Sequence, residues 1–301
     1  MNAKPHKQKL VVILGQTSVG KSDFAVQLAK DFEGEVLSAD SRQVYKGTNL
    51  LAGTITNAEM HGVPHHLLGF RDIREPYSVT EFVRDGSKCI ETITSCGKLP
   101  IVCGGSAMYI DALVYNQIFP KVDTNEKLRA ELSEKDTLEL YTILKSLDPV
   151  RASTIDTRNP RRLVRAIEIA TALGRVPEIT HGEGRYETLL IGLARPKPEL
   201  DARIKERITK RMEQNMISEI ISLHELGISY EYLRTFGLEF SALSDIAEGA
   251  KSEQVALSEL YFDTIHFAKR QLTWWKRNSD IVWVAPDEYQ KVKKLVSDFL
   301  S

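Results

Sequence analysis

The sequence lacks a surplus of charge of either sign and any long apolar run. Its 40 basic and 41 acidic residues leave a formal net charge of −1. No global basic excess therefore predicts a nucleic-acid partner, and any such site must come from local clustering. The apolar segment at residues 10–14 is far too short for a membrane span or a signal-peptide core. We expect a cytoplasmic protein without a membrane partner.

Metal-ligating residues are also scarce. The three cysteines, Cys89, Cys96 and Cys103, are odd in number and spaced by seven residues, which fits neither a disulfide framework nor a zinc site. We expect them to be ordinary buried or half-buried side chains. The pair His65-His66 has no acid or cysteine at ligand spacing, so a loop or a partly buried polar role is favoured over a metal site.

Apolar strands alternate with amphipathic helices in the first third of the chain and again near its end. The pattern predicts strands at 10–14, 35–39, 99–103, 188–194 and 281–285. It predicts helices at 21–32, after the capping box of Ser78 and Glu81, from about 106, at 199–226 with an interruption left open, at 252–276, and at the end. This rhythm indicates an α/β fold with a parallel sheet covered by helices on both faces.

The middle of the chain has a different pattern. Residues 119–186 show helices and no convincing strand, with helices expected at 124–133 and 136–147. A third helix is marked by Asn159 as N-cap, Pro160 at its first position and Gly174 after its end. We therefore predict a core of residues 1–118 and 187–301, interrupted by a helical insertion domain at 119–186.

A phosphate-binding loop follows the first predicted strand. The segment matches the P-loop pattern G-x-x-x-x-G-K-S with Gly15, Gln16, Thr17, Ser18, Val19, Gly20, Lys21 and Ser22. Its glycines let backbone N–H groups point at phosphate oxygens, and the following helix adds a favourable dipole. Lys21 is expected to reach terminal phosphates and the Ser22 hydroxyl to ligate Mg²⁺. The predicted core is therefore a P-loop NTPase-like sheet.

The acid that an NTPase usually carries near its metal is missing. The strand at 99–103 ends in Gly104-Gly105-Ser106, and the acid at a nearby strand end is Asp40. Three roles are open for Asp40 on its position alone: serving the metal, acting as a general base, or capping a turn.

Basic residues gather in three places. Arg158, Arg161, Arg162 and Arg165 oppose the dipole of the helix that they begin, which favours an anionic partner such as RNA over a solvated charged face. Arg203, Arg207 and Arg211 lie four apart, and either clamp a diphosphate or pair with Glu206 and Glu213. The segment 269–277 interleaves basic residues with Trp274 and Trp275, which suits nucleic-acid contact or places the indoles in the core.

Taken in order, these motifs resemble the tRNA dimethylallyltransferase (tRNA isopentenyltransferase) family of the bacterial type, over nearly the full length. The matching segments are Gly15–Ser22, Asp40–Gly47, Gly53-Thr54, Val63–Leu67, Pro100–Ser106, Arg161–Glu168 and Ala268–Trp274. Most are weak alone, but their order and spacing are specific because ordinary kinases share only the first.

The resemblance implies transfer of a dimethylallyl group to N6 of adenine 37, beside the anticodon of tRNAs that read codons beginning with U. The donor is dimethylallyl diphosphate rather than ATP, so the P-loop is expected to hold its diphosphate with Mg²⁺. The inserted lobe is expected to grip the anticodon stem-loop. Such enzymes usually act alone, which implies a monomer.

Residue roles follow from the same resemblance. Asp40 stands at the general base, Arg203 matches the arginine that contacts diphosphate, and Arg207 is the second choice. Thr17, Lys21 and Ser22 are expected to neutralise the leaving diphosphate, and Ser106 stands where the family usually has threonine. The positions that match tRNA contacts are Asp40, Ser41, Arg42, Gln43, Arg161, Arg162, Leu163, Val164 and Arg165.

The chain departs from the family pattern twice. Gln16 replaces a common proline, which is expected to loosen the loop slightly. The segment 234–239 replaces a pattern of Gly-Tyr followed by a basic or polar residue, which puts fine tRNA contacts in doubt but not the reaction. The alternatives are a P-loop prenyltransferase acting on free adenine nucleotides, a small-molecule kinase, and a non-catalytic RNA-binding protein with a nucleotide switch.

Overall fold

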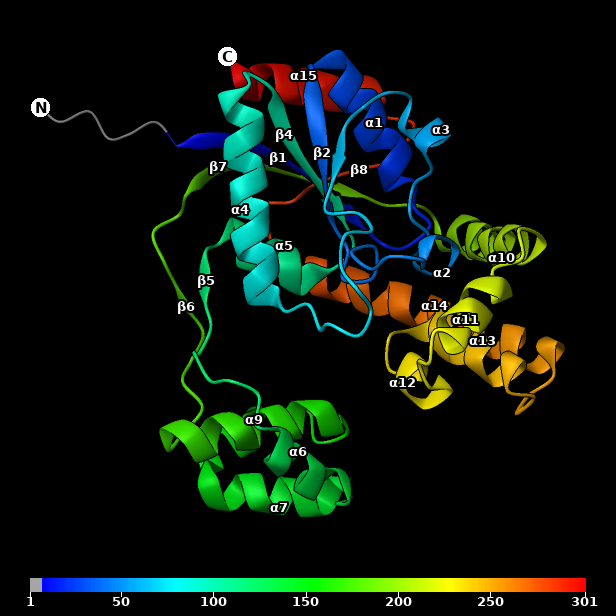
Figure 1. Cartoon of the computed structure of the whole chain (residues 1–301). Helices are drawn as coiled ribbons and strands as arrows, with labels where there is room; N and C mark the ends of the chain where they lie inside the picture. Colours follow the sequence, from blue (N-terminus) through cyan, green and yellow to red (C-terminus); the bar gives the residue numbers. More distant parts are fainter. Residues whose placement is uncertain (1–6) are drawn as a thin grey trace, which may run out of the picture. The chain divides into compact units, whose positions relative to one another are not determined.

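The computed structural model describes residues 7–301, and residues 1–6 of the predicted core lie outside this range. The chain forms two compact units (Figure 1). One runs up to Asn116 and resumes from Glu183 to Ser301; the other comprises Gln117–Gly182. The sequence-based boundaries at 119 and 186 lie within four residues of this division.

The first unit is built on a parallel sheet. Within residues 7–301, its six strands follow the order β3-β2-β4-β1-β7-β8, and every neighbouring pair is parallel. The strands are β1 (Gln8–Gly15), β2 (Gly34–Ala39), β3 (His65–His66), β4 (Leu99–Gly104), β7 (Tyr186–Leu193) and β8 (Val282–Val284). The order places β1 between β4 and β7, so the loop that follows it opens at the carboxyl edge of the sheet, and the end of β2 lies one strand beyond β4.

Helices cover both faces of this sheet (Figure 1). All the helices of this unit, whether or not they lie on the sheet, are α1 (Lys21–Asp31), α2 (Asn49–Ala52), α3 (Asn57–Met60), α4 (Val79–Ser95), α5 (Ala107–Val114), α10 (Lys197–Glu213), α11 (Ile217–Glu225), α12 (Tyr230–Arg234), α13 (Leu238–Ala247), α14 (Glu253–Trp275) and α15 (Tyr289–Leu300). Side chains of β1 alternate between two cores. Leu10, Val12 and Leu14 pack with α4 and α5, while Val11 and Ile13 pack with α1 and α15. The predicted α/β class is thus confirmed.

Most of the expected elements of this unit are present. The interruption left open in the helix at 199–226 is real: α10 ends at Glu213, and Asn215 takes a left-handed conformation with φ 63° before α11 begins. The short elements α2, α3, α12 and β3 were not predicted because they span too few residues to show a hydrophobic period, and α13 was also missed.

The second unit is a small helical lobe with its own core. Its helices are α6 (Glu126–Ser133), α7 (Thr137–Leu147), α8 (Pro149–Thr154) and α9 (Pro160–Leu173). As predicted, Asn159 caps α9 by accepting from the Arg162 N–H, and Gly174 ends it at φ 78°. The expectation of no strand at 119–186 is wrong at β6 (Thr180–His181), which pairs antiparallel with β5 (Gln117–Ile118) just before that range. Two-residue strands cannot show a measurable alternation.

Candidate active site

The P-loop wraps around its own lysine. Gly15 ends β1 at φ 145°, where a Cβ would lie 2.6 Å from the Leu193 carbonyl oxygen. Ser18 and Gly20 also take positive φ values of 60° and 104° before α1 begins. The Nζ of Lys21 donates to the Gln16 carbonyl at 2.6 Å. The loop is therefore folded for phosphate binding, with the N-terminus of α1 at its end.

Arginines reach the loop from α10. Arg203 Nε donates to the Ser18 carbonyl at 2.9 Å, and Arg207 Nη1 donates to the Thr17 hydroxyl at 3.2 Å. Arg207 Nη2 also approaches the Gly53 carbonyl at 3.3 Å. Pairing within the helix does not account for this stripe, because Glu206 forms its ion pair with Lys210 at 2.7 Å. The structure thus brings Arg203 and Arg207 together with the P-loop.

Asp40 lies at the carboxyl end of β2, next to the turn that follows β4. Its Oδ1 accepts from the Arg42 N–H at 2.8 Å, so a turn-capping role is present. The residues on either side of Asp40 are both held by Ser106. The Ser106 N–H donates to the Ala39 carbonyl at 3.2 Å, and its hydroxyl accepts from the Ser41 N–H at 3.1 Å. The predicted residues Asp40 and Ser106 are therefore adjacent.

The cations of the site perturb one another. The pKa of Lys21 is lowered to about 8, chiefly by burial; Cys103 and Asp40 act to raise it, and the Arg207 charge acts with burial to lower it. Burial also lowers the pKa of Arg207, and it lowers that of Arg211 to about 10, helped by the Arg207 charge. Like charges packed this closely favour a ligand with several negative charges.

Gly53 permits the arginines to pack together. A Cβ at Gly53 would lie 1.6 Å from Nη2 of Arg211 and 2.1 Å from Nη2 of Arg207. Arg211 is 8% exposed, and its Nη1 lies 3.5 Å from Oε1 of Glu239. Glu239 belongs to the segment that departs from the family pattern, and here it partly balances the cationic cluster.

Residues 41–43 and the departing segment also meet. Gln43 accepts from the Ser38 hydroxyl at 2.8 Å and donates to the Gly53 carbonyl at 3.2 Å. The Arg42 guanidinium lies 5.7 Å from the ring centre of Phe236. Phe236 is 6% exposed, so it supports Arg42 from the core side.

The residues present fit a magnesium ion that is bound mainly by substrate. Among residues 7–301, no cluster of three or more His, Cys, Asp or Glu side chains could hold a metal. Mg²⁺ is often bound through one or two protein oxygens, water and substrate phosphates. The Ser22 hydroxyl, at the start of α1, is a donor of that kind.

The basic cluster of the lobe divides into two groups. Arg161 and Arg162 are exposed on the first turn of α9. Arg165 instead donates to Glu168 at 3.0 Å and to the Val122 carbonyl at 2.9 Å. The Glu168 side chain is 1% exposed and also pairs with Arg129 at 2.8 Å. Arg165 therefore helps to neutralise a buried acid, and the exposed pair is better placed for an external anion.

Two other predicted contacts of the lobe are apolar residues that take part in its packing. Leu163 is fully buried in the core of the lobe, and Val164 packs against that core. The Leu163 side chain is therefore enclosed by the lobe, and a tRNA contact at this position stays a prediction.

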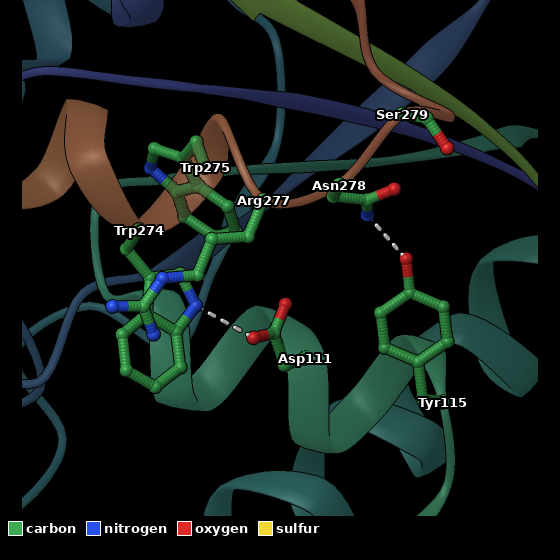
Figure 2. Close-up of a pocket in the computed structure, with 7 residues that line it drawn as sticks. All are labelled: Asp111, Tyr115, Trp274, Trp275, Arg277, Asn278 and Ser279. Atoms are coloured by element: carbon green, nitrogen blue, oxygen red, sulfur yellow. Dashed lines mark hydrogen bonds between the residues drawn. The ribbon is translucent and has the colours of Figure 1, made fainter.

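The end of α14 separates the two tryptophans of the basic segment. Trp275 is 1% exposed and anchors the core, whereas Trp274 is 39% exposed. Figure 2 shows the Trp274 indole N–H directed at Asp111 of α5, at 2.8 Å. Arg277 lies over the Trp274 ring at 5.5 Å, beside a cavity of about 330 Å³ between α5 and the end of α14. Trp275 therefore belongs to the core, and a nucleic-acid contact of this segment stays a prediction for Trp274.

Two glutamines form contacts between the P-loop and α14 that the sequence did not predict. Gln16 is 6% exposed and donates to the Ala268 carbonyl at 3.1 Å, so it ties the P-loop to α14 rather than loosening it. Gln271 contacts the loop from the same helix, at the Thr17 N–H. It was missed because a lone glutamine in a basic segment carries no chemical signal.

The cysteine and histidine expectations are confirmed only in part. Cys103 is buried, which raises its pKa to about 12, and Cys89 is half-buried. Cys96 is exposed, so the expectation of burial is wrong there; it directly follows α4. His65 and His66 are half-buried as expected but form β3 rather than a loop, and His66 pairs with Glu35 at 2.7 Å.

A parallel sheet with a P-loop between β1 and α1, and with arginines of a later helix on that loop, defines an α/β phosphate-binding protein of the P-loop class. The family model described as IPP transferase matches residues 43–278. The chain therefore belongs to the IPP transferase family.

Relatives of known name match along most of their length. The tRNA dimethylallyltransferase of Thermomicrobium roseum is 35% identical, covering 96% of this chain and 91% of the relative. The tRNA dimethylallyltransferase of Geobacillus thermodenitrificans is 36% identical, covering 92% and 90%.

Solved structures of tRNA-modifying transferases have a similar fold. The tRNA isopentenylpyrophosphate transferase of Bacillus halodurans is 29% identical with a TM-score of 0.74, covering 97% of this chain and 96% of that one. A eukaryotic dimethylallyltransferase acting on tRNA is 25% identical with a TM-score of 0.75, covering 93% and 74%. Within residues 7–301, no helix is both long and apolar enough to cross a bilayer.

Proposed function

We propose that this protein transfers the dimethylallyl group of dimethylallyl diphosphate to N6 of adenine 37, next to the anticodon of tRNAs that read codons beginning with U. It does so as a monomer, in the cytoplasm where its tRNA substrate resides. The relatives named tRNA dimethylallyltransferase support this proposal. The observation that carries it is the meeting of a cationic P-loop with the strand end that holds Asp40.

The transfer needs a base on one side and a stabilised leaving group on the other. The adenine N6 attacks C1 of the allyl group, the new N–C bond forms, and the bond from C1 to the diphosphate oxygen breaks. Asp40 accepts the N6 proton, and the diphosphate leaves with the bonding electrons. Because adenine is stacked in free RNA, it must leave its stack before it reaches Asp40.

The P-loop holds the leaving group. Backbone N–H groups at the start of α1, with Lys21 and the hydroxyls of Thr17 and Ser22, neutralise the diphosphate as its charge grows. The Ser22 hydroxyl would be a protein ligand of a magnesium ion, which would supply additional positive charge when bound.

Arg207 is the better placed of the two candidate arginines. Its guanidinium contacts the Thr17 hydroxyl, and its charge reaches Lys21. Arg203 donates through Nε to the Ser18 carbonyl and so holds the outside of the loop. We therefore assign the principal diphosphate contact to Arg207 and a supporting contact to Arg203.

The kcat/KM for dimethylallyl diphosphate should fall as the pH rises through about 8, the pKa of Lys21 in the free enzyme. The protonated amine binds diphosphate, so the favourable charge is present below this pH and is lost above it. In Lys21→Arg the fall should move to higher pH because arginine stays charged. The measurement is kcat/KM for the donor at saturating tRNA, from neutral to alkaline pH. A wild-type profile that stays flat through this range contradicts the assignment.

The exposed arginines of α9 should carry tRNA affinity. Replacing Arg161 and Arg162 with alanine should weaken tRNA binding and reduce the slope of log K against log salt by about one per lost phosphate contact. Donor affinity should stay unchanged. A double variant with Lys135→Ala and Lys145→Ala, at exposed positions of the lobe outside α9, is the matched control for loss of two positive charges. Equal tRNA affinity and salt slope in the arginine double variant and the control would exclude this contact.

The reaction itself is tested by mass spectrometry of tRNA nucleosides after incubation with dimethylallyl diphosphate. The expected product is adenosine whose mass has increased by one dimethylallyl group. Parallel incubation with AMP separates tRNA prenylation from prenylation of free nucleotides. An unmodified tRNA pool in the presence of folded protein would overturn the proposal.

A further inference from the structure

One side-chain amide joins the two halves of the candidate site. Gln271 lies on the buried face of α14 and is 7% exposed. Its Oε1 accepts from the Thr17 N–H at 2.8 Å, and its Nε2 donates to the Gly105 carbonyl at 2.9 Å. Both polar ends of the amide are therefore used, each by a different loop at the carboxyl edge of the sheet.

The loop after β4 is shaped for this contact. A Cβ at Gly105 would lie 2.5 Å from Nε2 of Gln271. Real Cβ atoms do not approach another atom this closely, so a residue with a Cβ at this position would displace the amide from the carbonyl. The close approach fixes the distance between α14 and the residue that precedes Ser106.

The hydrogen bond between Gln271 and Gly105 is linked to Asp40 through Ser106. Ser106 follows Gly105 directly and bonds both neighbours of Asp40, through its N–H to the Ala39 carbonyl and through its hydroxyl from the Ser41 N–H. A shift of the Gly105 carbonyl would therefore move the backbone that carries Asp40.

The hydrogen bond between Gln271 and Thr17 is linked in the same way to the proposed diphosphate site. The Thr17 backbone N–H is held by Gln271, and its hydroxyl accepts from Arg207 Nη1 at 3.2 Å. Thr17 is thus fixed from two directions. These two bonds tie the P-loop at Thr17 to both α10 and α14.

Gln16 adds a second tether between the same two elements. Its Nε2 donates to the Ala268 carbonyl, nearly one helical turn before Gln271. A proline, which the resemblance leads us to expect at this position, has no side-chain donor. The chain therefore joins the P-loop to α14 at two successive residues.

We propose that Gln271 is a positioning residue of the transfer reaction, which sets the separation between the diphosphate-binding loop and the turn that holds Asp40. This inference rests on the proposed function. Gln271 touches neither reacting atom. It acts through Thr17 on the leaving group and through Gly105 and Ser106 on the base.

The test is Gln271→Met in single-turnover prenylation with enzyme in excess and both substrates saturating. Methionine has a similar length but cannot hold the Thr17 N–H or the Gly105 carbonyl. The rate constant should fall about 10- to 100-fold, as expected when buried polar groups lose their partner. The amplitude should stay complete, and the pH dependence should keep its wild-type shape because Asp40 and Lys21 remain.

Thr264→Val is the matched control. Thr264 is another buried polar residue of α14, 6% exposed, and its hydroxyl bonds only within the helix, to the Leu260 carbonyl at 2.7 Å. Its rate constant and amplitude should match wild type. Should Q271M fail to fold, Q271E takes its place, because it keeps an acceptor for Thr17 and loses the donor to Gly105; the same fall in rate is expected.

The outcomes separate the two proposals. A wild-type rate constant in the Gln271 variant overturns the positioning role. So does a reduced amplitude with an unchanged rate constant, because that result reports only a smaller folded fraction. If the wild-type enzyme leaves every tRNA adenosine unmodified, the proposed function itself is overturned. This result is seen before any variant is compared.

Discussion

Replacing Asp40 with asparagine should slow prenylation of tRNA by about 10²- to 10⁴-fold at saturating substrates, the contribution typical of a positioned general base. Asparagine keeps an oxygen that can accept from the Arg42 N–H, so the turn after β2 should persist. It cannot take the N6 proton. The measurement is the single-turnover rate, with donor and tRNA affinities determined separately.

The affinities are the control for this variant. Both should stay within a few-fold of wild type, because the Asn side chain occupies the same volume and the cations of the P-loop are unchanged. A rate close to wild type would remove Asp40 from the role of base. A rate that falls only because the donor no longer binds would make it part of the diphosphate site instead.

Replacing Arg207 with alanine should lower kcat by about 10²- to 10³-fold, the loss expected when one preorganised donor to a developing negative charge is removed. The guanidinium lies on the Thr17 hydroxyl and beside Lys21, so it is placed to act on the departing diphosphate. Arg207→Lys should recover only part of the rate, because an ammonium cannot contact Thr17 and Gly53 together.

Arg203→Ala is the comparison that decides between the two arginines. Because Arg203 donates to the Ser18 carbonyl, its loss should loosen the loop and raise the donor KM more than it lowers kcat. The opposite ranking, with kcat falling further in Arg203→Ala, would restore the assignment that resemblance alone suggested. Thermal unfolding of both variants checks that neither loss reflects misfolding.

The sheet and its P-loop were predictable because their signals are local. A run of five apolar residues, two glycines and a lysine in fixed spacing specify β1, the loop and the start of α1. The capped helices α4 and α9 were equally clear, since Ser78 and Asn159 make the bonds that their positions indicated. Capping residues can be identified from the local sequence without knowledge of tertiary contacts.

What could not be predicted depends on residues that are distant in sequence. The bond from Gln271 to Thr17 joins residues that are 254 positions apart, and nothing in the local pattern of α14 indicates it. The role of Arg165 is another case. The sequence shows four nearby arginines, but it does not show that one of them, Arg165, forms an ion pair with a buried carboxylate. Two-residue strands such as β5 and β6 leave no period to detect.

The bond between Lys21 and the Gln16 carbonyl makes ligand capture an exchange rather than a simple addition. An incoming anion must replace a hydrogen bond that the ammonium already has, so only the difference between the two bonds contributes to affinity. A monoanion such as chloride offers little more than the carbonyl does. A diphosphate offers charge-assisted bonds to several donors at once. We therefore expect the loop to favour a diphosphate over small monovalent anions.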